Sequence, residues 1–431
     1  MADVDVVVVG AGIAGLRCAL RLEQLGHSVT VLEASDGVGG RQRTDRIDGF
    51  LIDRGFAILI PAYPAVRRWV DTEALGLQPF GEGVIVRRED RLAVLADPTR
   101  HPAWVRHTLT SGYLDPVRLA ALGRWLLPAM TDPKRLLNSP DITLAQSMDQ
   151  AGFTGALREE VFDTFLAGVV VESHGQTSAN FVKLLARCFI LSRASLPAEG
   201  MGALPAQLAD GLTQPPVLNS PVHHITEQGS GCQVHTDDAV LSARHVVVAA
   251  GPSAGPALTH RPPPAMHGLI TWYFEAPENP HPYPLLAIDG RRRGGRVPGP
   301  VWNAAVVSNA APTYAPPGRH LVQATTLLDR PDGQADEQHV RRHVSEIYGC
   351  PSDNWTMLRR VAVPEALPAL PPPFRPRSDQ RISDTVTAAG DHYDSSSIQG
   401  ALVSGHRAAN LAHATLTSGS SSASAGPDPS S

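Results

Sequence analysis

The sequence predicts an α/β protein whose two domains are each assembled from separate parts of the chain. A β-branched run, DVVVVG at 5–10, leads into a glycine-rich turn and a helical pattern, as is typical of a parallel strand buried on both faces. Two further apolar strand signals, VVVAAG at 246–251 and DTVTAAG at 384–390, come hundreds of residues later. We therefore expect one domain with a central parallel sheet and a β-meander, and an α+β domain with an antiparallel or mixed sheet and helices.

Composition is that of an ordinary globular protein. The 431 residues, 42% of them hydrophobic, can bury a sizeable core, and the net charge of −5 gives no reason to expect a nucleic-acid partner. The four cysteines have neither metal-ligand nor disulfide-framework spacing. We therefore expect a cytoplasmic protein without a bound metal, while the sequence leaves the oligomeric state open.

The apolar segments do not predict a membrane span. MADVDVVVVG at 1–10 lacks a basic region and a cleavage site, so we expect a strand and not a signal peptide. No stretch reaches the roughly 18 to 20 uninterrupted apolar residues that a span needs. Peripheral contact stays open, because VRLAALGRWLLPAM at 117–130 fits either a membrane interface or a helix packed on its own domain.

The turn after the first strand, GAGIAG, predicts a dinucleotide site in a Rossmann-like βαβ unit. Gly10, Gly12 and Gly15 fit G-x-G-x-x-G, which allows a tight turn, close approach of a pyrophosphate and close helix packing. Glu33 ends the second strand, SVTVLE, where a carboxylate accepts from a ribose hydroxyl and disfavours the 2′-phosphate of NADP. The expected contacts to the nucleotide are Gly10, Ala11, Gly12, Ile13, Ala14, Gly15, Glu33 and Ala34.

The segment EASDGVGGRQRT at 33–44 narrows the choice of dinucleotide. Gly39 and Gly40 let the backbone pass close to a cofactor, and Arg41 brings a fixed positive charge. An acid followed by Gly-Gly-Arg directly after the second strand resembles the flavin monoamine oxidases, phytoene-type carotenoid desaturases and protoporphyrinogen oxidases, which depend on FAD. The resemblance implies FAD as the cofactor, held noncovalently because no cysteine clearly matches the one that tethers flavin in some members.

Later segments extend this resemblance over most of the chain. IDGFLIDRGFAIL at 47–59 resembles the hairpin and Asp-x-Gly element near the flavin, and LPAEGMGALPAQLA at 196–209 resembles the segment before the adenine-contacting strand. AAGDHYDSSSIQGALVSG at 388–405 resembles the C-terminal flavin element. The resemblance thereby implies these further FAD contacts: Gly39, Gly40, Arg41, Gly200, Met201, Val222, Ala250, Gly251, Gly390, Asp391, Ser397, Ile398 and Ala401.

The C-terminal element also supplies the catalytic candidates. Ser397 is a suitable N-cap for a helix that begins at Ile398, and a helix N-terminus beside the flavin stabilises the negative charge of its reduced form. His392 and Tyr393 are candidates for acid, base or a wall of the site. The alternative is that both are loop residues that pack around the ribityl chain or face solvent.

Local patterns predict the elements between these motifs. Short strands broken by G-S-G and D-D within 221–251 predict a three-stranded meander that feeds VVVAAG as a further central strand. Residues 115–192 are mostly helical in pattern, and a helix is expected around 335–349. Strands are expected at 268–276, 300–308 and 320–328, and a hairpin that turns at Glu89 and Asp90 is expected at 83–96.

The positions of these motifs and of the predicted strands and helices give the expected domain boundaries. The discontinuous FAD-binding domain comprises 1–80, 197–262 and 378–416, and the substrate domain comprises 81–196 and 263–377. The low-complexity segment 417–431 is expected to be disordered.

Three classes of function fit these observations. The first is a desaturase or dehydrogenase that transfers a hydride from a small, apolar organic substrate to flavin N5, with a long apolar tunnel. The second is an amine or amino-acid oxidase that releases peroxide, although the only lysines, Lys134 and Lys183, offer no evident match for the lysine that amine oxidases of this superfamily use. The third is a noncatalytic FAD-binding protein. We expect the first, and the electron acceptor stays open.

Overall fold

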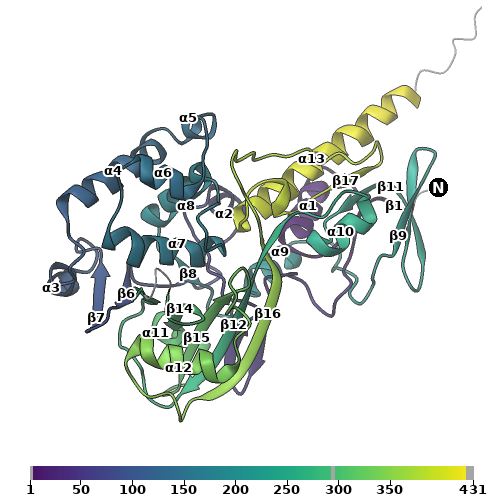
Figure 1. The fold of residues 1–431 in the computed structure, drawn as a ribbon. Helices are drawn as coiled ribbons and strands as arrows, with labels where there is room; N and C mark the ends of the chain where they lie inside the picture. Colours follow the sequence, from purple (N-terminus) through teal and green to yellow (C-terminus); the bar gives the residue numbers. More distant parts are fainter. Residues whose placement is uncertain (1–2, 293–296, 424–431) are drawn as a thin grey trace, which may run out of the picture.

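The computed structural model describes residues 3–292 and 297–423 and is built on two sheets. Figure 1 shows two lobes. The lobe around the six-stranded sheet near the N-terminus is called the nucleotide-type lobe, and in the second lobe helices cover the seven-stranded sheet. The chain passes between the lobes several times, so segments far apart in sequence share one sheet. This confirms the predicted α/β fold class, whereas the domain boundaries themselves stay a proposal.

The six-stranded sheet carries the nucleotide motif. Its order is β2-β1-β11-β10-β9, with β17 also paired to β11, and β2, β1, β11 and β17 run parallel. The carboxyl ends of these parallel strands therefore meet at one edge, where ligands bind in open α/β sheets. The strands are β1 (Val4–Val9), β2 (Val29–Leu32), β9 (His224–Gln228), β10 (Gly231–His235), β11 (Val240–Val248) and β17 (Val386–Ala388).

The last strand of the predicted meander and the predicted central strand VVVAAG form one continuous strand, β11. The first half of β11 pairs antiparallel with β10 through Val240 to Ala243, and its second half pairs with β17 through Val246 to Val248. The sequence LSARHVVV contains no glycine or proline to break the strand between these halves. The meander and the central sheet are therefore continuous through β11.

The second sheet has seven strands in the order β16-β12-β15-β14-β13-β6-β7. All its pairings are antiparallel except that of β13 with β6, so the sheet is mixed, as predicted. The strands are β6 (Gly83–Arg87), β7 (Leu92–Ala96), β12 (Met266–Ala276), β13 (Leu286–Asp289), β14 (Val301–Val306), β15 (His320–Leu327) and β16 (Thr356–Pro368).

Two strands of this sheet, β13 and β16, were not predicted. β16 is an edge strand that pairs with β12 alone, and it contains Arg359, Arg360 and Pro364 on a largely exposed ribbon. An edge strand tolerates proline and charge because one of its sides needs no ladder partner. Its sequence consequently lacks the apolar alternation by which the other strands are recognised.

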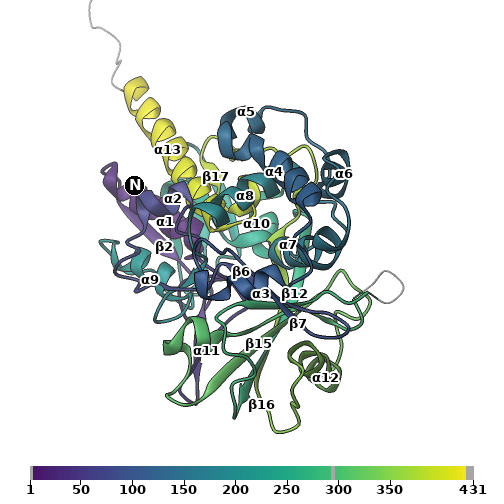
Figure 2. The same ribbon diagram turned by 90° about the vertical axis from the view of Figure 1, so that its left-hand side faces the viewer.

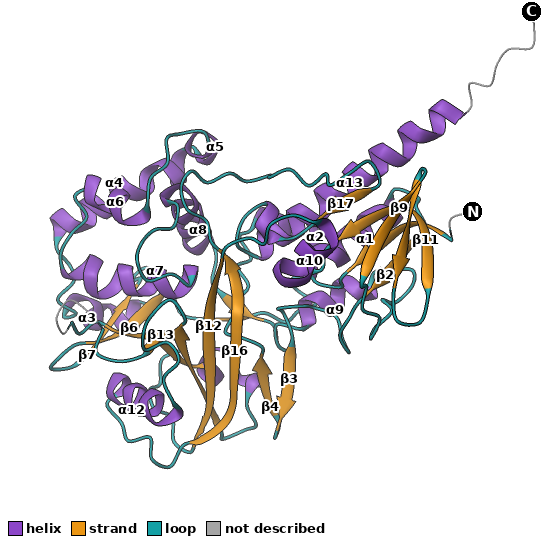
Figure 3. Ribbon diagram, turned by 45° about the vertical axis from the view of Figure 1, so that its right-hand side comes forward, coloured by secondary structure: helices purple, strands orange, loops and turns teal. Residues whose placement is uncertain are grey.

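Helices of the second lobe cover both faces of its sheet. Ile85 of β6 belongs to a core with Val340 and Val344 of α12 on one face, whereas its neighbours Val84 and Val86 belong to the core that α7 and α8 share. Figure 3 shows α12 and α7 on opposite sides of the strands. The helices of this lobe are α3 (Val105–Leu109), α4 (Pro116–Thr131), α5 (Pro133–Leu137), α6 (Leu144–Gln150), α7 (Asp163–Val170), α8 (Ala179–Leu191), α11 (Val307–Ala310) and α12 (Glu337–Tyr348).

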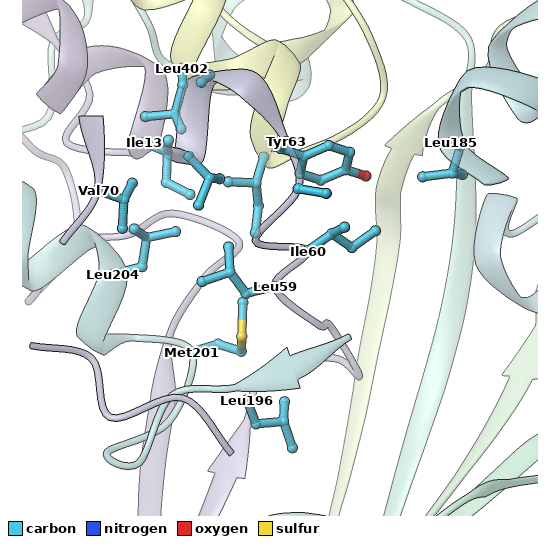
Figure 4. Close-up of a cluster of buried hydrophobic side chains, with 14 of the residues drawn as sticks. Ile13, Leu59, Ile60, Tyr63, Val70, Leu185, Leu196, Met201, Leu204 and Leu402 are labelled. Atoms are coloured by element: carbon cyan, nitrogen blue, oxygen red, sulfur yellow. The ribbon is translucent and has the colours of Figure 1, made fainter. Parts of the chain in front are cut away.

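The nucleotide-type lobe packs its helices around the opening βαβ unit. Figure 4 shows side chains from the start of α1, the segment 59–70, the 196–204 segment and α13 meeting in one apolar cluster. This cluster joins the start and the end of the chain beneath the carboxyl edge of the sheet. The remaining elements are α1 (Ile13–Gln24), α2 (Pro64–Trp69), α9 (Ala203–Asp210), α10 (Gly251–Thr259), α13 (Ile398–Ala423), β3 (Thr44–Ile47), β4 (Phe50–Asp53), β5 (Gln78–Pro79) and β8 (Ser195–Leu196).

The last helix, α13, crosses α1 at very short range. A Cβ atom on Gly405 would overlap the carbonyl oxygen of Ala14, so only glycine permits this approach. The helix ends at Ala423, so residues 417–423, which were expected to be disordered, are helical. Residues 424–431 lie outside the described part of the chain. Within the described ranges, no helix has the length and hydropathy to cross a bilayer.

We predict that Gly405→Ala destabilises the protein because its methyl group would separate α1 from α13. The expected loss is about 2–3 kcal/mol of unfolding free energy, measured by denaturant unfolding. The matched control is Gly123→Ala in α4, where the new methyl meets nothing within 4 Å, so helix propensity should make that variant equally or more stable. Equal stability of the two variants would contradict the close-packing account.

Candidate active site

The turn between β1 and α1 opens the site. Gly10 has a φ of +105°, which disfavours any other residue, and its amide donates to the carbonyl oxygen of Leu32 at 2.7 Å. A side chain on Gly10 would also press against the carbonyl oxygen of Ala249 at the end of β11. The first turn of α1 itself contains no acidic residue, so the side chains of the helix leave its unpaired N–H groups and partial positive charge available to a ligand anion.

Glu33 is held against this turn by its side chain. Its Oε2 accepts from the amide of Ala11 at 2.7 Å, and its Oε1 accepts from the amide and hydroxyl of Ser35 at 2.9 and 2.7 Å. A carboxylate has about four acceptor positions, so one lone pair on Oε2 stays available to a ribose hydroxyl. Ala34 follows directly in the loop after β2.

The Gly-Gly-Arg loop lies beside the same turn. The amide of Gly39 donates to the carbonyl oxygen of Ala11 at 2.8 Å, and Gly40 faces the Cα of Gly12. Pro205 of α9 contacts Gly39, which brings the 200–205 segment against this loop. The structure thus brings three sequence-predicted segments together at the sheet edge.

Arg41 joins this loop to the C-terminal flavin element. Its guanidinium Nη2 lies 2.6 Å from Oδ1 of Asp391, whose side chain is 4% exposed. Burial by itself would raise the pKa of Asp391, but the charge of Arg41, together with hydrogen bonds from His392 and Arg41, holds that pKa below its usual range. Asp391 is therefore ionised at neutral pH, and the buried pair fixes Gly390 and Asp391 across from the first glycine turn.

The N-terminus of α13 is capped as predicted. Ser397 Oγ accepts from the amide of Gly400 at 3.1 Å, and Ser395 Oγ lies 3.1 Å from Ser397 Oγ. The first turn, which begins with Ile398 and includes Ala401, contains no acidic residue. A Cβ atom on Gly400 would overlap the backbone of Ser395, so the lack of a side chain at Gly400 permits the tight loop before the helix.

The segment at Gly200 and Met201 is tied to the β3–β4 hairpin. Oδ1 of Asp53 accepts from the amide of Met201 at 3.0 Å and from Thr44 Oγ1 at 2.6 Å, and its Oδ2 accepts from Tyr314 Oη at 2.9 Å. Complete burial outweighs these three donors and raises the pKa of Asp53 to about 6. This network was not predicted, because Tyr314 comes from the other lobe and carries no motif.

Two of the predicted contacts, Val222 and Ala250, lie just outside strands of the six-stranded sheet. Val222, just before β9, and Ala250, just after β11, pack against one apolar cluster with Val9 and Leu32. Gly251 begins α10 with a φ of +79°.

Two cavities flank the loop that precedes α13. His392 and Tyr393 contact each other with ring centroids 4.4 Å apart in a tilted arrangement, and they line a cavity of about 200 Å³ under α10, together with Gly251 and Ala389. A separate narrow cavity of about 10 Å³ lies beside Ser396. No residue lines both cavities, so the structure does not place the two catalytic candidates with Ser396; their catalytic role stays a prediction.

The residues at the sheet edge fit FAD. Two acid-free helix N-termini, the cationic Arg41 and the spare acceptor of Glu33 match a pyrophosphate, a flavin ring and a ribose. Gln42 Oε1 is buried without a hydrogen-bond partner among the described residues, and unpaired buried polar atoms are uncommon in native proteins. The donor set therefore suits an extended dinucleotide.

The two-lobe fold and this site define the class of FAD-dependent oxidoreductases. A putative protoporphyrinogen oxidase from Exiguobacterium sp. 255-15 has the same fold, with a TM-score of 0.71 over 96% of this chain and 99% of that chain, at 18% identity. Residues 13–413 match the model of the flavin containing amine oxidoreductases. The chain belongs to that family, and membership implies FAD as its cofactor.

Individual relatives match shorter stretches. The putative flavin-containing monoamine oxidase AofH of Mycobacterium tuberculosis is 51% identical over 63 residues, which cover 15% of this chain and 14% of AofH. Amine oxidase [flavin-containing] B of Canis lupus familiaris is 26% identical over 290 residues, 62% of this chain and 54% of that protein. The chain thus spans little more than half of the second relative and much less of the first.

We predict that Asp391→Ala weakens FAD binding, because it removes a buried acceptor and leaves Arg41 without its counter-charge. The expected loss is roughly ten- to a hundredfold in affinity, measured by titrating the apoprotein with FAD. Asp379→Asn is the control, since that side chain is 76% exposed in a neighbouring loop. Unchanged affinity in the Asp391 variant would contradict a role at the cofactor.

A second prediction concerns the pH dependence of stability that Asp53 causes. Its native pKa of about 6 lies above the usual 3.8, so between about pH 4 and 6 the native state keeps a proton that the unfolded chain has released. Stability from this group therefore falls as pH rises through that window, and Asp53→Asn removes the effect. The wild-type unfolding free energy minus that of the variant should fall by up to about 3 kcal/mol.

Asp45→Asn, in the same hairpin, is the control for this measurement. A hydrogen bond from Arg54 lowers the pKa of Asp45, so its contribution is present above its usual pKa and is lost as pH falls. The difference between wild type and this variant should consequently change with pH in the opposite direction. Parallel curves for wild type and Asp53→Asn would contradict the assignment to Asp53.

Proposed function

We propose that this protein oxidises a small, apolar organic substrate, with FAD held noncovalently as the hydride acceptor. The proposal rests on the cavity beside Ser396, directly before the N-terminus of α13. Its ten lining residues include no acidic side chain, lysine or arginine that would pair with a charged substrate: Val169, Val170, Thr177, Phe181, Leu185, His267, Leu367, Pro368, Leu370 and Ser396.

The elements around this cavity explain its apolar character. α7 contributes Val169 and Val170, α8 contributes Phe181 and Leu185, and β16 contributes Leu367. Since an apolar wall binds a substrate through the area removed from water, it favours a hydrocarbon over an ammonium or a carboxylate. His267, at the start of β12, is the lining side chain suited to accept a proton.

The cavity at about 10 Å³ has room for about one water molecule. A substrate therefore enters only when the surrounding elements separate, and we propose that α8 moves relative to the end of β16. Phe181 of α8 packs against Phe374, which follows β16 in the chain, with ring centroids 5.4 Å apart in a tilted arrangement, so this aromatic pair is where α8 and the segment after β16 would part. Closure over the substrate would exclude water from the reacting carbon.

We propose the following roles at the cofactor. FAD, when bound, supplies an acceptor for the hydride. The turn at Gly10 to Gly15 binds the pyrophosphate, Glu33 orients the ribose, and Arg41 with Asp391 positions the ribityl-phosphate region. The N-terminus of α13 at Ile398 stabilises developing negative charge on the ring.

An amine oxidase is the second candidate function, favoured by the family and by the name of the canine relative. Lys134 lies in α5 and Lys183 lies in α8, so neither belongs to the seven-stranded sheet. Lys183 instead contacts the ring of Trp125 at 5.5 Å, facing α4. This arrangement, with the uncharged cavity, places the amine oxidase second.

Two broader proposals complete the assignment. We propose the domain division 1–80, 197–262 and 378–416 against 81–196 and 263–377, because the six-stranded sheet falls within the first set and the seven-stranded sheet within the second. We also propose a reducing, cytoplasmic setting, because all four cysteines are free thiols: Cys18, Cys188, Cys232 and Cys350.

The test is anaerobic mixing of the FAD-loaded protein with panels of isoprenoids and of amines, while flavin absorbance is followed. Reduction by apolar compounds supports the proposal, and reduction by amines alone would replace it with the second candidate. Failure of every compound in both panels to reduce the flavin would count against both.

Leu185→Phe gives a prediction for whichever compound reduces the flavin. The larger ring fills the cavity beside Ser396 and should lower the reduction rate at limiting substrate about tenfold or more, while flavin content stays unchanged. Leu191→Phe on the same helix is the control, since Leu191 is 44% exposed and outside the cavity. Equal rates in the two variants would show that the substrate binds elsewhere.

A further inference from the structure

The second lobe exposes an unusual amount of apolar surface on its outer helices. Among the described residues, nine of the thirteen exposed large apolar side chains lie between 105 and 191. The largest exposed fractions are those of Val117 at 68%, Leu109 at 65% and Leu127 at 56%. We call Val105, Leu109, Leu114, Val117, Leu119 and Leu127 the α3–α4 patch. Exposed groups of this kind, in contrast to scattered single residues, mark binding surfaces.

Helix α4 is apolar on two opposite faces. Ala121, Trp125 and Ala129 are buried toward the lobe, and Trp125 Nε1 donates to Ser147 Oγ at 3.0 Å. On the outer face, Val117 and Leu127 lie about three turns apart on one side of the helix. A helix on the surface of a protein usually has a polar outer face. The apolar outer face of α4 is therefore suited to contact with an apolar environment outside the protein.

The charges around the patch have the sign opposite to that of the whole chain. Residues 100–137 contain six basic and two acidic side chains, whereas the chain carries −5. Arg106, Lys134 and Arg135 are exposed, next to or beyond the ends of the apolar helices. Figure 1 places α3, α4 and α5 at the edge remote from the end of α13, and Figure 2 shows this edge from the front.

We propose that the surface formed by α3, α4 and α5 docks on a bilayer that contains anionic lipids. The leucine and valine side chains of the α3–α4 patch would enter the headgroup–acyl boundary, and Arg106, Lys134 and Arg135 would contact lipid phosphates. Exposed leucine combined with local positive charge fits this occupant, since a neutral apolar protein groove would leave the basic side chains without partners.

Helix α8 connects this surface to the candidate substrate cavity. Phe181 and Leu185 line the cavity, whereas Lys183 and Arg187 face α4, with Arg187 Nη1 donating to the carbonyl oxygen of Met130 at 2.8 Å. Helices α4 and α8 therefore lie between the docking surface and the cavity. The docking proposal does not rest on the proposed function.

Co-sedimentation of the FAD-loaded protein with vesicles tests the proposal. We expect binding to vesicles of phosphatidylcholine mixed with phosphatidylglycerol, weaker binding to phosphatidylcholine alone, and release by salt. Val117→Ser combined with Leu127→Ser should lower the partition coefficient about tenfold. The matched control, Val240→Ser with Met357→Ser, changes exposed apolar residues elsewhere, at 53% and 37% exposure.

Flavin content and thermal midpoint of each variant show that the fold is kept, so that lost binding is attributed to the surface. Absence of binding to both vesicle types at low salt would overturn the proposal. Equal loss in the control pair would also overturn it, because the effect would then be nonspecific. Arg106→Gln combined with Lys134→Gln should weaken binding to the anionic vesicles alone, and no change there would contradict the electrostatic part.

Discussion

The close crossing of α1 and α13 is the constraint on which the rest of the site depends. The two helices come from opposite ends of the chain, and their approach at Ala14 and Gly405 leaves no space for a Cβ atom. It brings the loop before α13 to the same sheet edge as the glycine turn at Gly10. Arg41 and Asp391, whose loops come from opposite ends of the chain, meet at this edge at 2.6 Å.

This constraint explains how one cofactor site can be made from such distant segments. The N-terminal segment presents the acid-free start of α1 and the oriented carboxylate of Glu33, which suit the ADP half of FAD. The C-terminal segment presents the capped start of α13, which suits the reactive ring. The other lobe contributes the apolar walls of α7, α8 and β16 around the cavity beside Ser396, directly before that helix. Cofactor binding and substrate selection are thereby assigned to different parts of the chain.

Local features of the site could be predicted from the sequence, because glycine turns, caps and buried strands leave patterns within a few residues. Gly10, Glu33 and the Ser397 cap are of this kind. The features that were missed depend on contacts between remote segments. Asp53 acquires its environment from Tyr314, and the cavity joins Phe181 to His267. β16 was not predicted because an edge strand needs little apolar alternation. β11 was predicted as two separate strands because its two halves pair with different strands.

The central claim is that the two ends of the chain together hold one FAD without a covalent bond. Acid precipitation of the purified protein, followed by flavin analysis of the supernatant and the pellet, tests it most directly. The account predicts about one FAD per chain, all of it in the supernatant. Flavin retained in the pellet would contradict noncovalent binding, and protein that neither contains FAD nor takes it up on incubation would contradict the site itself.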